Sequence, residues 1–192
     1  MKKFLLSHFN RAIRILLATN ALILLAGAML GPIYAIFVEE IGGDLMDASV
    51  AGFLFAITAG LITLYTGKYS DGMRHSDKIV ILGYSLIGTG FLLYQLVDSV
   101  MSLFAIQILI GIGEAVYSPA FDKLYSKHLD WGKSGTEWGT WESMNYFTAA
   151  FGALVGGILV TWLGFAALFY LMAFLSFSSG LYLYVVSPQR VL

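Results

Sequence analysis

The sequence predicts an all-α membrane protein that crosses the bilayer six times, because of its composition, its apolar runs and the placement of its basic residues. Of its 192 residues, 58% are hydrophobic and only 12% are charged, whereas roughly 25% are charged in a typical soluble domain. The mean hydropathy is +0.79. A net charge of -1 offers no basic surface to a nucleic acid, and there is no cysteine. We therefore expect one six-helix domain over residues 1–192, surrounded by the lipid bilayer, with no nucleic-acid partner.

Six apolar runs each approach the roughly 20 residues that a spanning helix needs. Unpaired backbone groups are costly in lipid, so such runs close their hydrogen bonds internally as helices. The first run follows a basic start that resembles a signal peptide, but it is long enough to be retained as a span. The helices are expected at about residues 12–38, 48–66, 79–97, 101–121, 143–163 and 165–187.

The basic residues are sorted between the two sides of the membrane. All eleven Lys and Arg lie before the first helix, between helices 2 and 3, between helices 4 and 5, or at the end of the chain. The connections at 39–47, 98–100 and 162–164 carry none. The positive-inside rule then places both termini in the cytoplasm, and we expect a multi-pass protein of the plasma (inner) membrane.

The connection between helices 2 and 3 concentrates residues that can form switchable contacts. Gly67 allows two helix ends to approach closely, and Asp71 can cap a helix or pair with a cation. Arg74 and Lys78 are cations of the same loop. A solvated charged loop is the simpler interpretation, and we favour a functional one because of the position and spacing of these residues.

Helix 4 carries Glu114, the one acidic residue that we place near the middle of the bilayer. Gln107, Glu114 and Ser118 share one helix face with Gly111, and Tyr117 is next to that face. A carboxylate at this depth costs at least about 2.5 to 3.5 kcal/mol on insertion scales, so it is expected to face a cavity or a partner. The alternative is a neutral glutamic acid that only joins helices by hydrogen bonds.

Several further residues are candidates for packing or for a substrate or proton path. Small residues spaced four apart let helices pack backbone to backbone, which predicts a packing role for the glycines of helices 4 and 5. Asn20 and Tyr34 interrupt the apolar run of helix 1 and are candidates to line a cavity. Asn145 lies at the cytoplasmic start of helix 5, where it can line a vestibule or simply lie at the membrane interface. The packing candidates are Gly111, Gly113, Gly152, Gly156 and Gly157.

Two of these stretches resemble the signature motifs of the major facilitator superfamily (MFS). Gly67 and Asp71 match its loop before helix 3, with Arg74 in the place of a second glycine. In helix 4, the glycines at 111 and 113 and the following proline match, with Gln107 where the family has an arginine. The glycines of helix 5 are similar to the glycine-rich motif of the superfamily's antiporters, but the proline usually found in that motif is absent from this chain. The resemblance implies the N-terminal six-helix half of an MFS transporter, built from two three-helix units.

The resemblance implies a secondary active transporter that moves a small solute by alternating access, driven by a proton or solute gradient. The resemblance makes the loop at 67–78 the expected latch. From its place within the membrane, we expect Glu114 to be the protonatable or substrate-contacting group. From the topology alone, we expect Asp122 at the cytoplasmic end of helix 4 to pair with Arg74 or Lys78. A second half would come from a parallel homodimer or from another six-helix chain. The alternative is a non-transporting fragment or subunit that needs a partner chain.

Enzymatic chemistry is not expected. All three histidines lie in polar flanks, so no Ser and His can face each other within the bilayer, and no metal site is expected. The chain has no Gly-x-x-x-x-Gly-Lys-Ser/Thr motif, so we expect no nucleotide cofactor.

Overall fold

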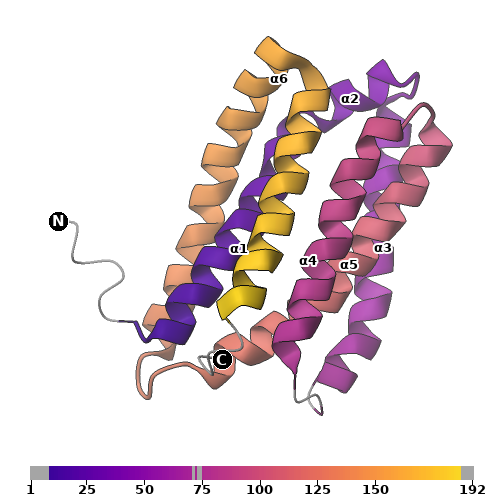
Figure 1. Cartoon of the computed structure of the whole chain (residues 1–192). Helices are drawn as coiled ribbons and strands as arrows, with labels where there is room; N and C mark the ends of the chain where they lie inside the picture. Colours follow the sequence, from indigo (N-terminus) through magenta and orange to yellow (C-terminus); the bar gives the residue numbers. More distant parts are fainter. Residues whose placement is uncertain (1–8, 71, 73–74, 187–192) are drawn as a thin grey trace.

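The computed structural model describes residues 9–70, 72 and 75–186, and within these ranges it has helices and no strand. Figure 1 shows long helices standing side by side, with their connections gathered at the two ends of the bundle. Five helical stretches of the described chain are long and apolar enough to cross a membrane. The predicted all-α architecture is confirmed, whereas six crossings and the side of the termini stay predictions.

The first stretch is a helix with a break near its end. α1 (Arg11–Leu30) begins after Asn10, whose side chain accepts a hydrogen bond of 2.9 Å from the backbone N–H of Ile13. The 3₁₀ turn η1 (Gly31–Ile33) follows, and α2 (Tyr34–Glu40) completes the stretch. The single helix expected over 12–38 is therefore interrupted, because the proline of η1 has no N–H to donate.

α3 (Leu45–Ser70) and α5 (Val100–Lys127) run longer than the apolar runs that predicted them. The extra turns of α3 end at Ser70, and those of α5 include Lys123. The Lys123 ammonium donates a hydrogen bond of 2.7 Å to the backbone carbonyl of Ser70, the last residue of α3. Hydropathy identifies only the part of a helix that is apolar enough to lie in lipid, so the hydropathy-based prediction left out these polar turns.

α4 (Ser76–Leu93) ends in the 3₁₀ turn η2 (Tyr94–Leu96), and a tight connection leads to α5. Ser99 caps α5 in a reciprocal arrangement with Ser102, in which each side chain bonds to the other residue's backbone N–H. The short hairpin makes α4 and α5 antiparallel neighbours.

α6 (Ser134–Val186) is a helical hairpin of 53 residues. A straight helix of this length would extend about 80 Å, far beyond one bilayer. The helical backbone is interrupted at Gly164, whose φ of 77° is in the region that glycine adopts most readily. Figure 1 shows the two resulting arms, orange and yellow, side by side. We call residues 134–163 the first arm and residues 165–186 the second arm.

The spatial order of the helices differs from their order along the chain. α1 packs against α6, α5 packs against both α3 and α4, and α4 also packs against α6. Ser179 of the second arm donates a hydrogen bond of 2.6 Å to the carbonyl of Thr19 in α1. The helices of the two expected three-helix units therefore interleave in one bundle.

Glycines of the first arm allow it to lie against α1. A Cβ added at Gly156 would overlap the backbone carbonyl of Met29, and one at Gly152 would come within 2.7 Å of the Ala28 Cβ. Gly157 differs, because an added Cβ there would meet nothing within 4 Å. The packing expected of Gly157 is thus not formed within the described chain, since this residue lies on another side of the first arm.

Two outward faces of the bundle are apolar and exposed. Only Ala51 and Ser70 are buried in α3. The exposed large side chains of α3 are Leu45, Met46, Phe53, Ile57, Leu61, Leu64, Tyr65 and Tyr69. Those of the first arm are Tyr146, Phe147, Phe151, Leu154, Val155, Ile158, Trp162 and Leu163. Lipid or another protein chain is needed to cover both faces.

Candidate functional site

A cavity of about 520 Å³ opens among the helices of the bundle. It is lined by residues from α1, η1, α2, α3, α4, η2, α5 and both arms of α6. This volume lies within the roughly 300 to 1,000 Å³ of typical small-molecule sites. The polar side chains of the lining are Tyr34, Tyr94, Gln107, Glu114, Tyr117 and Asn145.

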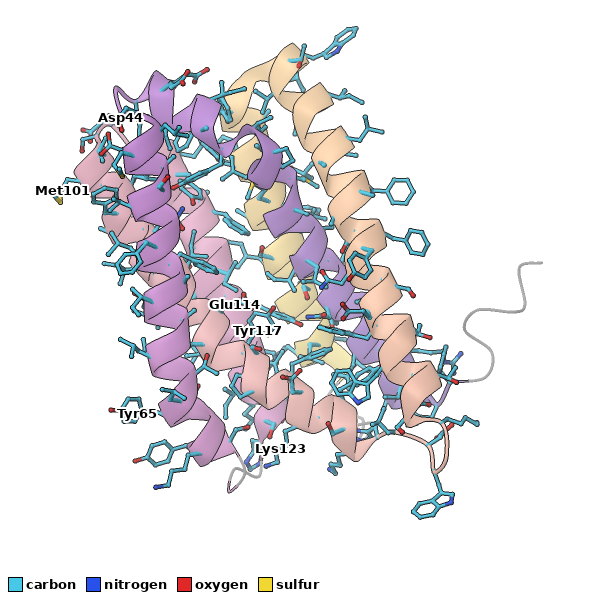
Figure 2. All side chains as sticks on the ribbon, turned by 180° about the vertical axis from the view of Figure 1, so that it is seen from behind. Asp44, Tyr65, Met101, Glu114, Tyr117 and Lys123 are labelled. Carbon is cyan, nitrogen blue, oxygen red and sulfur yellow. The ribbon has the colours of Figure 1, made fainter. Side chains whose placement is uncertain are left out.

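α5 supplies three of these six polar groups. Gln107 and Glu114 are two helical turns apart and therefore on the same face of the helix. The Gln107 amide donates a hydrogen bond of 2.6 Å to the Tyr34 hydroxyl of α2. Figure 2 shows Glu114 and Tyr117 close together on α5. We call Tyr34, Gln107, Glu114 and Tyr117 the cavity cluster.

Close backbone contacts hold α5 in this position. A Cβ added at Gly83 of α4 would come within 2.8 Å of the Gly113 carbonyl of α5. On another side of α5, one added at Gly111 would come within 2.8 Å of the Phe55 carbonyl of α3. Because glycine alone permits these approaches, the two contacts fix how α5 is rotated and so which side chains reach the cavity.

Two of the expected substrate or proton contacts lie elsewhere. Ser118 is not among the residues that line the cavity. Asn20 is also absent from the lining and is almost fully buried. Its amide donates a hydrogen bond of 3.2 Å to the Tyr84 hydroxyl, and its carbonyl oxygen accepts one of 2.8 Å from the Trp141 indole N–H. We call Asn20, Tyr84 and Trp141 the closed cluster, because its members satisfy one another.

The apolar part of the lining was not predicted. Phe55 and Phe91 line the cavity beside the polar groups, and the ring centroid of Tyr117 lies 4.9 Å from that of Tyr84. Aromatic residues occur in every α-helix of the described chain except α1, so no spacing in the sequence separates those that face a cavity from those that face lipid.

Part of the expected latch lies outside the described residues, namely Asp71 and Arg74. Gly67 faces open space, and Lys78 and Asp122 are exposed, with no ion pair between the latter two in the part of the chain that the structure describes. The expected pairing of Asp122 with Lys78 is thus not seen in this conformation. What joins these helix ends is the bond from Lys123 to Ser70 and a second one, of 2.6 Å, from the Thr66 hydroxyl to the Ala115 carbonyl.

The connection between α5 and α6 is held by a buried carboxylate that the sequence did not indicate. Glu137 is fully buried, and one of its oxygens accepts a hydrogen bond of 2.9 Å from the Asp130 backbone N–H. Its backbone carbonyl accepts another, of 2.6 Å, from the Tyr125 hydroxyl. Asn10 joins this connection to the start of α1 through a bond of 2.6 Å to the His128 carbonyl.

No group of His, Asp and Glu side chains suited to a metal ion occurs among the described residues. The chemistry that the cavity offers is one carboxyl, several hydroxyls and two amides, set in an apolar wall. Such groups can bind a solute and exchange a proton.

The fold and the cavity define a multi-pass helical membrane protein with a polar site between its helices. The sequence model of the Major Facilitator Superfamily matches residues 16–191, and the chain belongs to this family. Membership assigns it to membrane transporters and not to a class of enzymes.

Three curated relatives from this family are similar to the chain, and each is named an uncharacterized MFS-type transporter. YitZ of Bacillus subtilis is 28% identical over 160 residues, which are 81% of this chain and 94% of YitZ. YuxJ of the same organism is 24% identical over 98% of this chain and 49% of YuxJ. MJ1560 of Methanocaldococcus jannaschii is 22% identical over 84% of this chain and 42% of MJ1560. The chain thus spans about half the length of the latter two relatives. No solved structure matches it.

Proposed function

We propose that this chain forms half of a secondary active transporter that moves a small solute by alternating access, with Glu114 as the proton- or substrate-contacting group. The observation that carries this proposal is the position of Glu114, which is the one acidic side chain in the lining of the cavity. An ionisable residue that faces a cavity among membrane helices is costly to keep there and usually marks an ion or substrate path. Gln107, Tyr117, Tyr34 and Asn145 are the neutral groups that would contact the solute.

The proposal includes six crossings, with both arms of α6 spanning the membrane. The reversal at Gly164 supports this count, since each arm is then close to the length of one span. Both termini would lie in the cytoplasm of a cell whose plasma membrane holds the protein, because the basic connections then all lie on that side. Gly67, Asp71, Arg74, Lys78 and Asp122 remain the proposed conformational latch.

A second six-helix half would complete the cavity. The exposed apolar faces of α3 and the first arm support this, because a second half packed on them would cover their large apolar side chains. The partner that we propose is an identical chain, parallel and related by an axis along the membrane normal. The half-length relative YitZ supports this choice, and a second six-helix chain is the alternative.

Transport can be tested with the purified chain in liposomes that contain a pH-sensitive dye. A panel of sugars, amino acids, organic cations and organic anions is added, and solute-driven proton movement is recorded for wild type, Glu114→Gln and Glu40→Gln. We expect an active solute whose rate falls at least about tenfold in Glu114→Gln, because the proton or substrate contact is lost. Glu40 is exposed in α2 and outside the cavity, so Glu40→Gln is the matched control. An unchanged rate in Glu114→Gln would contradict the role of this residue.

The second half can be tested separately by native mass spectrometry in nanodiscs. We expect a dimer, and because the chain has no cysteine, single cysteines can locate the interface. Phe151→Cys in the first arm should cross-link between chains with a short bis-maleimide. Leu82→Cys, on an exposed position of α4, should not. A lone monomer without transport activity would favour the alternative, a non-transporting half that needs a partner chain, and this fits the half-length match to YuxJ.

A further inference from the structure

We infer that the ligand of this cavity is an organic cation with an apolar, aromatic body. The inference rests on the proposed function for its assumption that the cavity binds a solute. It goes beyond that function in naming the chemical class of the solute.

The charge of the lining is the first observation. Glu114 is the only acidic group among the described residues that line the cavity, and none of these residues is Lys, Arg or His. The eleven Lys and Arg are confined to the two ends of the chain and the connections of one side. An anion in this cavity would face a carboxylate without a compensating cation, whereas a cation would pair with it in a site partly shielded from water.

The shape and chemistry of the wall are the second observation. Five aromatic rings surround the cavity: Tyr34, Phe55, Phe91, Tyr94 and Tyr117. Aromatic faces attract cations within about 6 Å of the ring centre, and they also stack on flat apolar groups. The remaining wall is aliphatic side chains and glycines, so few groups are placed to bind the many hydroxyls of a sugar. The walls therefore favour a lipophilic cation over a polyhydroxyl solute.

The hydrogen bonds within the cavity cluster support the same class. The Gln107 amide already donates to Tyr34, and Tyr117 lies against Glu114, so part of the polar capacity is used within the protein. The Glu114 carboxylate is then the group in the cavity that can interact most strongly with a ligand. An identical second chain would add a second Glu114 and no basic group, so the preferred charge would be the same in the homodimer.

A direct binding measurement separates ligand class from transport. The probes are tetraphenylphosphonium and tetraphenylborate, which have nearly the same size and four phenyl rings but opposite charges. Equilibrium binding is measured on the full chain in nanodiscs large enough for a dimer, with empty nanodiscs subtracted. We expect saturable binding of tetraphenylphosphonium alone. Glu114→Gln should weaken this binding at least about tenfold, and Glu40→Gln should leave it unchanged.

A second variant covers the possibility that Glu114→Gln fails to fold. Asn145 lines the edge of the cavity, and Asn145→Lys adds a cation there. This variant should lose binding of tetraphenylphosphonium and gain binding of tetraphenylborate. The inference is overturned if wild type shows no saturable binding of the cation, if folded Glu114→Gln binds it as wild type does, or if Asn145→Lys keeps the preference of wild type.

The outcomes also separate this inference from the proposed function. Transport of a neutral or anionic solute without binding of tetraphenylphosphonium would overturn the ligand class and leave alternating access standing. Binding of the cation that depends on Glu114, with no transport of any solute, would support the ligand class and contradict transport by this chain.

Discussion

The closed cluster around Asn20 and the cavity cluster around Glu114 contain similar polar side chains but have different roles. Each combines a side-chain amide with tyrosine hydroxyls, and each bridges separate helices. In the closed cluster, Asn20 is 1% exposed and Tyr84 is 0% exposed, and both ends of the amide are used. In the cavity cluster, Glu114 is only partly buried and borders open volume. Polar residues inside a membrane bundle are therefore structural where they satisfy one another and available to a ligand where a cavity leaves them partly unsatisfied.

The largest effect on stability is expected from Asn20→Leu. This change removes the partner of the buried Tyr84 hydroxyl and of the half-buried Trp141 indole N–H, and each lost bond costs about 0.6 to 1.5 kcal/mol. We expect the free energy of unfolding in mixed micelles to fall by about 1 to 3 kcal/mol. The measurement is a denaturing-detergent titration followed by circular dichroism.

Asn145→Leu is the matched control, because it makes the same change in the wall of the cavity. It should alter the free energy of unfolding by less than about 0.5 kcal/mol, as is usual away from buried polar networks. Equal losses in the two variants would remove the distinction between the clusters.

A smaller effect is expected from Trp141→Phe, which keeps an aromatic ring and removes the indole N–H. The oxygen of Asn20 then loses its donor, and the free energy of unfolding should fall by about 1 kcal/mol. In the double variant with Asn20→Leu, the loss should be smaller than the sum of the two single losses, since the two groups bond to each other. Additive losses would mean that the hydrogen bond contributes nothing of its own.

Sequence patterns predicted the α-helical fold and an acidic side chain that borders a cavity, because apolar run length and a lone acidic residue are strong local signals. They placed Asn20 in the cavity, because a polar interruption looks the same whether its partner is a ligand or Trp141, 121 positions away. Glu137 was missed for a related reason, since it lies in a polar connection and its burial depends on how the loop folds back. Rotation of a helix and the path of a loop are set by distant contacts, and these leave no periodic signal in one sequence.

Tyr34→Phe tests the cavity side of the comparison with a still smaller effect on stability. It removes the hydroxyl that accepts the Gln107 hydrogen bond, but the freed amide borders the cavity and can be reached by water or ligand. The free energy of unfolding should change by less than about 0.5 kcal/mol. The affinity for tetraphenylphosphonium should change by about two- to fivefold, because the aromatic ring at position 34 in the wall of the cavity is altered. A loss of stability as large as that of Asn20→Leu would place Tyr34 and Gln107 in a structural role.

The smallest effect on stability is expected for Asp130, whose side-chain hydrogen bonds lie at the surface, in the connection before α6. Hydrogen bonds from Asn10 and Lys133 lower the pKa of Asp130 below its usual range near 3.8. A depressed pKa in the folded state means that the stabilisation is present above the unfolded pKa and is lost as the pH falls through the folded one. The melting temperatures of wild type and Asp130→Asn should therefore differ slightly at pH 7 and converge only once the pH is below the lowered pKa of Asp130 in the folded state. A difference that persists well below that pKa would show that Asp130 acts through its shape in the loop and not through its charge.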